Sequence, residues 1–181
     1  AKAFNESSSI IDPLDVTREF SEYGRDDWAV HVALVEQNLP TAGAVALPSL
    51  NRTYCSNDIS SLSKGIEKIR IVCSRTRPGP AAELLATELS GNLIYMGSAG
   101  AKAMSVVQGS SEIYVHTGGQ YEWDSCAPVA VALAHGLHAS RLDGSPLKYN
   151  QQDTYLPDLL ICRKELAEVS GNCSPEASGK I

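Results

Sequence analysis

The chain has 181 residues, enough for one substantial domain or two small lobes. Its 43% hydrophobic and 20% charged content is typical of globular proteins, and its net charge of −6 argues against nucleic-acid binding through a broad positive surface. Five scattered cysteines, without a Cys-x-x-Cys pair, argue against a disulfide or zinc framework. We recognise no signal peptide and no apolar run long enough to span a membrane, and we therefore expect a cytoplasmic protein.

The predicted elements alternate between strands and helices. Polar and apolar residues alternate over 27–36, which predicts a strand. The other predicted strands cover residues 42–48, 52–55, 69–74, 93–96, 112–116, 138–142 and 159–162. The predicted helices cover residues 80–89, 101–108, 124–135 and 163–169. The serine-rich stretch 57–65 is expected to be a loop and a candidate seam between two lobes. This order indicates an α/β (α+β) fold.

Two acidic segments carry the functional interpretation. Residues 12–17 read Asp-Pro-Leu-Asp-Val-Thr, which places two carboxylates on one tight loop. Such carboxylates repel each other unless a cation lies between them, and Mg²⁺ prefers hard oxygen ligands of this kind. Residues 122–128 read Glu-Trp-Asp-Ser-Cys-Ala-Pro, with Asp124 as a candidate N-cap and Pro128 in the first helical turn. Gly136 is the expected helix stop. Taken singly, the first pair reads as a solvated turn and Asp124 as a plain cap.

Together the two segments resemble the motifs of the inositol monophosphatase-like superfamily of Mg²⁺-dependent, Li⁺-sensitive phosphatases. The first motif of that superfamily reads Asp-Pro-Ile/Leu-Asp-Gly-Thr and the second reads Trp-Asp-x-x-Ala, which correspond here to residues 12–17 and 123–127. The resemblance runs from about residue 10 to about residue 166. It implies the layered fold of alternating helices and mixed β-sheets of the inositol monophosphatase/fructose-1,6-bisphosphatase group, without the N-terminal part of that group.

One branch of the superfamily fits best. Residues 18–20 read Arg-Glu-Phe, which resembles the 3'(2'),5'-bisphosphate nucleotidases that remove the 3'-phosphate of 3'-phosphoadenosine 5'-phosphate (PAP). Similar likenesses, nearest to the actinobacterial type, lie in residues 74–77, 97–102 and 142–147. The resemblance implies a phosphomonoesterase of sulfur assimilation that converts PAP to AMP and phosphate, with the sulfated form PAPS as a further candidate. The alternatives are inositol monophosphatase or fructose-1,6-bisphosphatase activity, or an inactive member that only binds a ligand.

The resemblance also implies an organisation and a set of partners. Residues 1–60 are expected to form the remainder of a first lobe with the first motif, and residues 61–170 a second α/β lobe with the Trp-Asp motif. Residues 171–181 are expected to be a flexible tail. The expected partner is a small phosphorylated substrate, with neither nucleic acid nor membrane, and a homodimer is left open.

Individual residues receive roles from the resemblance. The implied ligands of two or three Mg²⁺ ions are Asp12, Asp15, Asp124 and the backbone carbonyl of Leu14. Asp15 and Thr17 are the catalytic candidates, with the Thr17 hydroxyl orienting the attacking water or simply capping a helix. The N–H groups of Val16 and Thr17 would meet the phosphate at the start of a short helix, and Asp124 would also face the substrate.

A second phosphate on the substrate requires further cations. Arg75 and Arg77 follow a strand end and can each form a bidentate pair with phosphate. Ser98 and Lys102, near the start of a helix, are candidate ribose or phosphate contacts. All of these can instead be ordinary solvated side chains. His31 is expected to be a buried core residue.

Two departures from the superfamily pattern stand out. Val16 replaces the glycine of the first motif, and a β-branched residue tolerates a positive φ poorly. We expect strain of about 1–3 kcal/mol there and a gain of phosphatase activity on Val16→Gly. A further metal-binding glutamate, which the superfamily carries well upstream of the first motif, has no counterpart in this chain, and reduced activity is expected from its absence.

Overall fold

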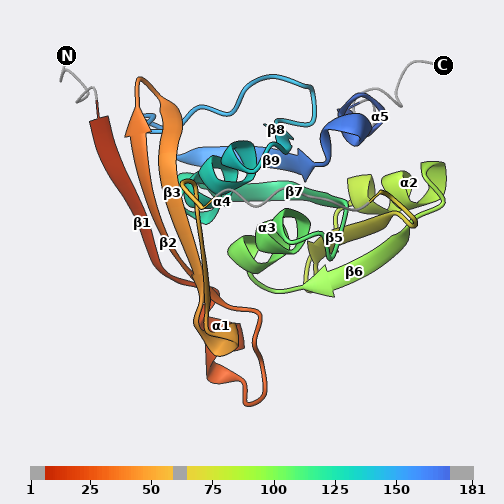
Figure 1. The fold of residues 1–181 in the computed structure, drawn as a ribbon, viewed down its shortest axis with the longest axis horizontal. Helices are drawn as coiled ribbons and strands as arrows, with labels where there is room; N and C mark the ends of the chain where they lie inside the picture. The colour runs from red at the N-terminus through yellow and green to blue at the C-terminus, as the bar shows by residue number, and fades with distance from the viewer. Residues whose placement is uncertain (1–6, 59–64, 172–181) are drawn as a thin grey trace.

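Two β-sheets with two helices packed between them make up the computed structural model, which describes residues 7–58 and 65–171 (Figure 1). The first sheet is antiparallel throughout, with the strand order β1-β2-β3-β4. Its strands are β1 (Ser7–Asp15), β2 (Ala29–Glu36), β3 (Leu39–Leu47) and β4 (Arg52–Cys55).

The second sheet is mixed, with the order β6-β5-β7-β9-β8. Its strands are β5 (Arg70–Ser74), β6 (Asn92–Met96), β7 (Ile113–Tyr121), β8 (His138–Ser140) and β9 (Tyr155–Cys162). Strand β5 runs parallel to both β6 and β7, whereas β9 is antiparallel to β7 and β8. The chain therefore leaves β5 for β6 on one side and returns to β7 on the other.

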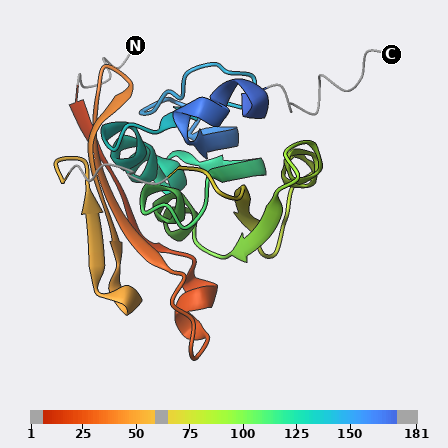
Figure 2. The same ribbon diagram turned by 45° about the vertical axis from the view of Figure 1, so that its right-hand side comes forward.

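The helices form layers against these sheets. They are α1 (Thr17–Ser21), α2 (Pro80–Glu88), α3 (Ala99–Val107), α4 (Glu122–Ala134) and α5 (Ala167–Gly171), with 3₁₀ turns at Pro48–Leu50 and Lys164–Leu166. Helices α3 and α4 lie between the two sheets, and α2 lies on the opposite face of the second sheet (Figures 1 and 2). The layered α/β fold is thus confirmed. Within the described part of the chain, no helix combines the length and apolar character needed to cross a membrane.

Alternation along the strands explains this layering. In β5, Ile71 and Cys73 pack with Ala82 of α2, whereas Val72 between them packs with Met104 of α3 on the other face. Strand side chains point alternately to the two faces of a sheet, so an apolar strand needs helices on both sides. The second sheet has them.

In the first sheet, only the inner face is covered by helices. In β2 every second residue is buried, whereas Val32 and Leu34 on the outer face are 47% and 38% exposed. The inner face lies directly on α4, and Gly43 of β3 marks the closest approach. A Cβ atom at Gly43 would lie 2.8 Å from the Cβ of Ala130 and 2.9 Å from the carbonyl oxygen of Ala127.

Several sequence predictions need correction. The acidic pair does not lie on a free loop but ends the nine-residue strand β1, which sequence alternation alone did not reveal because serines precede it. Strand β7 continues beyond residue 116 to Tyr121, and β9 begins at Tyr155 rather than at residue 159, with Pro157 inside it. The closing helix is a 3₁₀ turn followed by the short α5.

The predicted lobes stay a prediction. The sheet changes between β4 and β5, which agrees with a division near residue 60, but residues 59–64 and 172–181 lie outside the described residues. One hydrophobic cluster runs from the first sheet through α3 and α4 to the second. The two sheets therefore share a core.

The close approach at Gly43 gives a first test. Gly43→Ala is expected to lower the free energy of unfolding by about 1–3 kcal/mol, because the added methyl group has to displace backbone and Cβ atoms of α4. Urea denaturation at constant temperature measures this loss. Gly65→Ala is the matched control, because a Cβ there meets nothing within 4 Å. Equal stability of the two variants would contradict direct packing of β3 on α4.

Candidate active site

Asp12 and Asp15 lie at the end of β1, both buried, with exposed fractions of 8% and 4%. In a regular strand, residues three apart point to opposite faces. Here the pairing of β1 with β2 shifts register between the two aspartates, opposite His31 and Ala29. The shift at the Asp-Pro-Leu-Asp step brings both carboxylates into the interior. Leu14 lies between them, and its N–H donates to Oδ1 of Asp12 over 3.1 Å.

The carboxylate of Asp15 is fixed by hydrogen bonds from the start of helix α3. Its Oδ2 accepts hydrogen bonds from the Ser98 hydroxyl and, over 2.8 Å, from the Gly100 N–H, both at the start of α3. Nε2 of His31 lies 3.4 Å from the same oxygen. Burial alone would raise the pKa of Asp15, but His31, Ser98 and Gly100 outweigh it and hold that pKa below its ordinary value. Asp15 is therefore a preorganised carboxylate.

His31 is the buried core residue expected from the sequence, with 1% exposure, but it also supports the site. Its Nδ1 is 3.1 Å from the carbonyl oxygen of Trp123, the residue before Asp124. Burial would lower the pKa of His31, yet the neighbouring Asp15 raises it. One ring thus lies between the segments that carry the two motifs.

Asp124 lies in the first turn of α4. Its predicted role as N-cap is wrong, because the helix begins at Glu122 and Tyr121 is the cap residue. Oδ2 of Asp124 accepts a hydrogen bond from the Tyr121 N–H over 2.7 Å, which fixes the side chain at the helix start. Pro128 accordingly lies inside the helix rather than in its first turn, whereas Gly136 follows the helix with a φ of 78°, as expected for a stop.

The three carboxylates converge. One oxygen from each of Asp12, Asp15 and Asp124 lies within 4.8 Å of the others. Burial, followed by the charge of Asp15, raises the pKa of Asp12, and the same two causes raise the pKa of Asp124. Hard oxygen donors in a negatively charged group suit Mg²⁺, so the residues present fit this cation. A role of the Leu14 carbonyl as a ligand stays a prediction.

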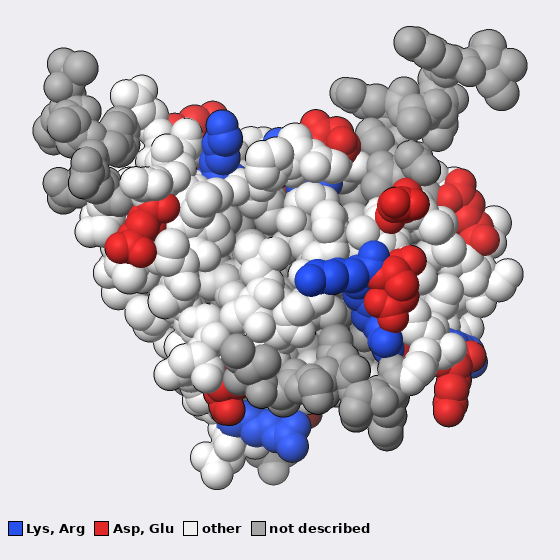
Figure 3. Space-filling view, turned by 45° about the horizontal axis from the view of Figure 1, so that its top comes forward, with Lys and Arg blue, Asp and Glu red and all other residues white. Residues whose placement is uncertain are grey.

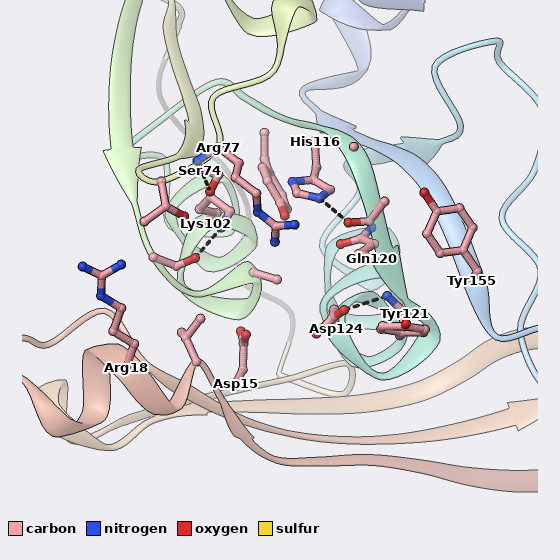
Figure 4. Close-up of a pocket in the computed structure, with 17 residues that line it drawn as sticks. Asp15, Arg18, Ser74, Arg77, Lys102, His116, Gln120, Tyr121, Asp124 and Tyr155 are labelled. Carbon is pink, nitrogen blue, oxygen red and sulfur yellow. Dashed lines mark hydrogen bonds between the residues drawn. The ribbon is translucent and has the colours of Figure 1, made fainter.

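A cavity of about 380 Å³ opens beside this cluster (Figure 4). It is lined by Asp15, Val16, Arg18, Ser74, Thr76, Arg77, Gly97, Ala99, Lys102, Tyr114, His116, Gly118, Gly119, Gln120, Tyr121, Asp124 and Tyr155. The wall residues 74–77, 97–99 and 116–121 follow or end the parallel strands β5, β6 and β7. Ligands of open α/β sheets bind at this kind of position, where the chain reverses direction across the sheet.

Among the predicted anion contacts, Arg77 and Lys102 line the cavity, as does Arg18. The Lys102 ammonium donates to the Gly97 carbonyl oxygen over 2.7 Å and lies 5.4 Å from the ring centroid of Tyr114. Arg75 does not line the cavity. Its guanidinium binds the buried carboxylate of Asp27 over 2.7 Å, so the arrangement favours Arg77 as the phosphate contact.

Ser98 and Thr17 both lie outside the cavity lining. Ser98 is fully buried and lies behind the cavity wall, where it accepts from the Ala101 N–H and donates to Asp15. Its place therefore indicates a positioning role. Thr17 begins the short α1, as expected, but it is exposed and does not line the cavity.

Val16 has the left-handed backbone that the glycine of the motif suggested, with φ 66° and ψ 84°. Its carbonyl accepts from the Phe20 N–H over 3.3 Å, which closes the single turn of α1. A left-handed conformation is costly for a β-branched residue. Val16 therefore joins Asp15 to α1 at the expense of local strain.

The sequence interpretation missed Gln120, Tyr121 and Tyr155. They line the cavity because β7 continues past Gly118 and Gly119, where its pairing with β9 shifts register. The Gly-Gly pair just before the Trp-Asp motif was the available signal, because glycines inside a strand often mark a bulge.

The strain at Val16 can be measured. Val16→Gly is expected to raise the free energy of unfolding by about 1 kcal/mol, because relief of about 1–3 kcal/mol of strain exceeds the entropic cost of glycine, about 0.5–1 kcal/mol. Val16→Ala is the matched variant, which keeps a Cβ atom and should gain less. Urea denaturation of the three chains provides the comparison. A Val16→Gly chain no more stable than the original would show that the loop is unstrained.

We expect Mg²⁺ to reverse which of two chains, the original or Asp124→Asn, is the more stable. Without divalent cations, Asp124→Asn should raise the unfolding temperature, because one of three mutually repelling charges disappears while an acceptor for the Tyr121 N–H remains. With excess Mg²⁺ the original chain should become the more stable, because Asp124→Asn weakens binding by roughly 10–100-fold or more. Differential scanning fluorimetry across a Mg²⁺ titration shows both effects.

Glu67→Gln is the control for that titration, because it makes the same change of charge at an exposed site away from the cavity. It should follow the original chain at every Mg²⁺ concentration. Parallel curves for Asp124→Asn and Glu67→Gln would exclude Asp124 as a metal ligand.

Comparisons with known proteins agree with this geometry. The chain is 50% identical over 173 residues to the 3'-phosphoadenosine 5'-phosphate phosphatase of Mycobacterium leprae (strain TN), and the match covers 88% of this chain and 64% of the relative. It is 52% identical over 169 residues to the protein of the same name from Mycobacterium tuberculosis (strain CDC 1551 / Oshkosh), with 88% and 63% covered. The chain thus spans slightly less than two thirds of these curated relatives.

Solved structures share the fold. Inositol monophosphatase II from Staphylococcus aureus MSSA476 matches with a TM-score of 0.80 at 18% identity, over 96% of this chain and 70% of that one. CysQ from Bacteroides thetaiotaomicron matches with a TM-score of 0.74 at 24% identity, over 88% and 70%. The family model described as "Inositol monophosphatase family" matches residues 4–171. With nearly the whole described chain matched, and with mycobacterial relatives about half identical to it, the chain belongs to the inositol monophosphatase family.

Proposed function

We propose that the protein containing this chain is a Mg²⁺-dependent phosphomonoesterase that hydrolyses the 3'-phosphate of PAP to give AMP and phosphate. One observation carries the proposal: three carboxylates gather within 4.8 Å at one end of a cavity that is also lined by Arg77 and Lys102. The names of the mycobacterial relatives, both 3'-phosphoadenosine 5'-phosphate phosphatases, support PAP as the substrate. PAPS is a further candidate substrate.

The acidic side of the cavity would bind the metal ions. Asp12, Asp15 and Asp124 would hold two or three Mg²⁺ ions, with the Leu14 carbonyl as a further ligand. Bound Mg²⁺ supplies an acidified water and charge stabilisation for phosphoryl transfer. Asp15 is already oriented by Ser98 and Gly100, so little reorganisation would be needed at the reacting centre. The Thr17 hydroxyl, at the start of α1 beside Val16, stays a proposed water-orienting group, and for this role its exposed side chain would have to turn toward the cavity.

Cationic side chains would hold the phosphate groups. In Figure 4, Arg77 and Lys102 lie across the cavity from Asp15 and Asp124, and Arg18 lies nearer its outer edge. Arg77 can bind phosphate through two parallel N–H donors, and the Val16 and Thr17 N–H groups are further candidates.

Since the chain has a net charge of −6, these few cationic side chains have to supply the attraction for an anionic substrate. On the face drawn in Figure 3, Lys and Arg occur in small groups beside acidic residues.

Further properties of the protein belong to the same proposal. They are a cytoplasmic location, a small-molecule partner rather than nucleic acid, a homodimer, and the division into lobes at residues 1–60 and 61–170 with a tail at residues 171–181. An inactive member that only binds a ligand is the second candidate, and the left-handed Val16 is the observation that favours it.

Phosphate release tests the function. With Mg²⁺, PAP is expected to be hydrolysed at least about tenfold more efficiently than inositol 1-phosphate or fructose 1,6-bisphosphate, because a site that binds particular polar groups rejects analogues lacking them. Chelation of Mg²⁺ should abolish the release, and Li⁺ should inhibit it. Arg77→Gln should lower kcat/KM for PAP by ~10-fold or more through loss of a charge-assisted contact.

Arg52→Gln is the matched control for the arginine change, because Arg52 bonds to Tyr54 and Gln108 away from the cavity. Its kcat/KM should equal that of the original chain. Equal rates on all three substrates would remove the assignment to PAP. A folded chain that binds PAP but releases phosphate from none of the substrates would favour the inactive candidate for this chain.

A further inference from the structure

Three exposed aromatic side chains gather at one end of the cavity. Tyr121 and Trp123 stack with ring centroids 4.7 Å apart and planes 9° from parallel. Tyr155 meets Tyr121 edge-on, with centroids 6.3 Å apart. Tyr121 and Tyr155 both line the cavity and are 48% and 49% exposed, while Trp123 is 39% exposed. The three rings contact one another and two of them line the cavity, so they form one aromatic group at the site.

The backbone builds this wall in a specific way. Tyr121 of β7 and Tyr155 of β9 are direct partners across the sheet, beyond the register shift that contains Gly118 and Gly119. A Cβ atom on Gly119 would overlap the hydroxyl oxygen and the adjoining ring carbons of Tyr155. The hydroxyl end of the ring therefore lies against bare backbone, and about half of Tyr155 stays exposed, at 49%. Only glycine at position 119 allows this placement.

A buried polar group accompanies the rings. The side chain of Gln120 lines the cavity and is only 7% exposed, and within residues 7–58 and 65–171 its Nε2 has no hydrogen-bond partner. The hydroxyl of Tyr114, also in the cavity lining, is fully buried and likewise lacks a partner in that part of the chain. Buried polar groups are nearly always hydrogen-bonded in folded proteins. A ligand in the cavity that carries a hydrogen-bond acceptor would satisfy the Nε2 group of Gln120.

Together these features match one kind of chemical group. Phosphate needs cations and N–H donors, which the cavity supplies at Arg77 and Lys102, and it gains nothing from aromatic rings. A planar heteroaromatic base offers a π-face for a tyrosine ring and ring nitrogens that accept from an amide. A sugar or cyclitol ring has no π-face and no ring nitrogen; it can meet a tyrosine ring only through C–H groups and an amide only through hydroxyl oxygens.

We propose that Tyr155, Tyr121 and Gln120 form a nucleobase subsite that makes the cavity selective for nucleotides over sugar or inositol phosphates. The base lies on the open surface of Tyr155, with Tyr121 supported from behind by Trp123, and the Gln120 amide donates to a ring nitrogen. This inference rests on the proposed function for the choice of a nucleotide, but it concerns specificity rather than hydrolysis.

A binding comparison tests the subsite without any reaction. AMP and ribose 5-phosphate carry the same 5'-phosphate and differ in the base, so the ratio of their dissociation constants reports the contribution of the base. Isothermal titration calorimetry with Mg²⁺ present is expected to show AMP binding at least about tenfold more tightly. Tyr155→Ala should remove most of this preference, and Tyr155→Phe should keep it because the ring remains.

Two further variants separate stacking from folding. Tyr155→Leu keeps apolar bulk against Gly119 without a π-face, and it should lose the preference while unfolding at a temperature close to that of the original chain. Tyr95→Ala removes a tyrosine that is 47% exposed outside the cavity lining, and it should keep the preference.

The outcomes distinguish the two proposals. A preference for AMP that survives in both Tyr155→Ala and Tyr155→Leu would overturn the subsite, as would an original chain that binds AMP no better than ribose 5-phosphate. A chain that shows the ring-dependent preference but releases no phosphate from PAP would support the subsite and refute the proposed hydrolysis.

Discussion

The concentration of negative charge at Asp12, Asp15 and Asp124 is the constraint on which the rest of the structure depends. Three carboxylates within 4.8 Å repel one another, and burial adds to the cost of their charges. The pKa of Asp12 and that of Asp124 are raised as a result. A chain free to relax would separate them. The fold prevents this, because each carboxylate belongs to an element that is packed for other reasons.

These elements come from different layers. Asp12 and Asp15 end a strand of the first sheet, Asp124 opens α4, and the groups that hold Asp15 open α3. Helices α3 and α4 share one apolar cluster with both sheets, so their first turns cannot move independently. Asp27 adds a polar link, since its carboxylate accepts from Arg75 and from the Gly97 N–H just before α3. Close packing of the apolar core therefore fixes the positions of the three carboxylates.

Local sequence predicted those parts of the molecule that local rules determine. The helix after Pro80, the apolar β5 and the two acidic motifs follow from proline, periodicity and residue type. The convergence of the motifs came only through resemblance, since it depends on a register shift in β1 and on packing between layers. The sequence did not predict Tyr121 and Tyr155 as site residues. Gly118 and Gly119 interrupt the apolar pattern inside β7, and Pro157 does the same near the start of β9, so both strands were predicted too short. Register and cross-strand pairing are properties of two segments at once, which explains why one segment alone did not reveal them.

The conformation of Val16 shows how strongly the neighbours of the site determine its backbone. Before it, Asp15 is tied to Ser98 and Gly100; after it, Phe20 packs edge-on against Trp28 with ring centroids 5.0 Å apart. Between Asp15 and the single turn of α1 the chain changes direction at Val16, which has a left-handed φ of 66°. Glycine would satisfy the geometry without strain, so the valine is tolerated by the surrounding packing rather than required by the site.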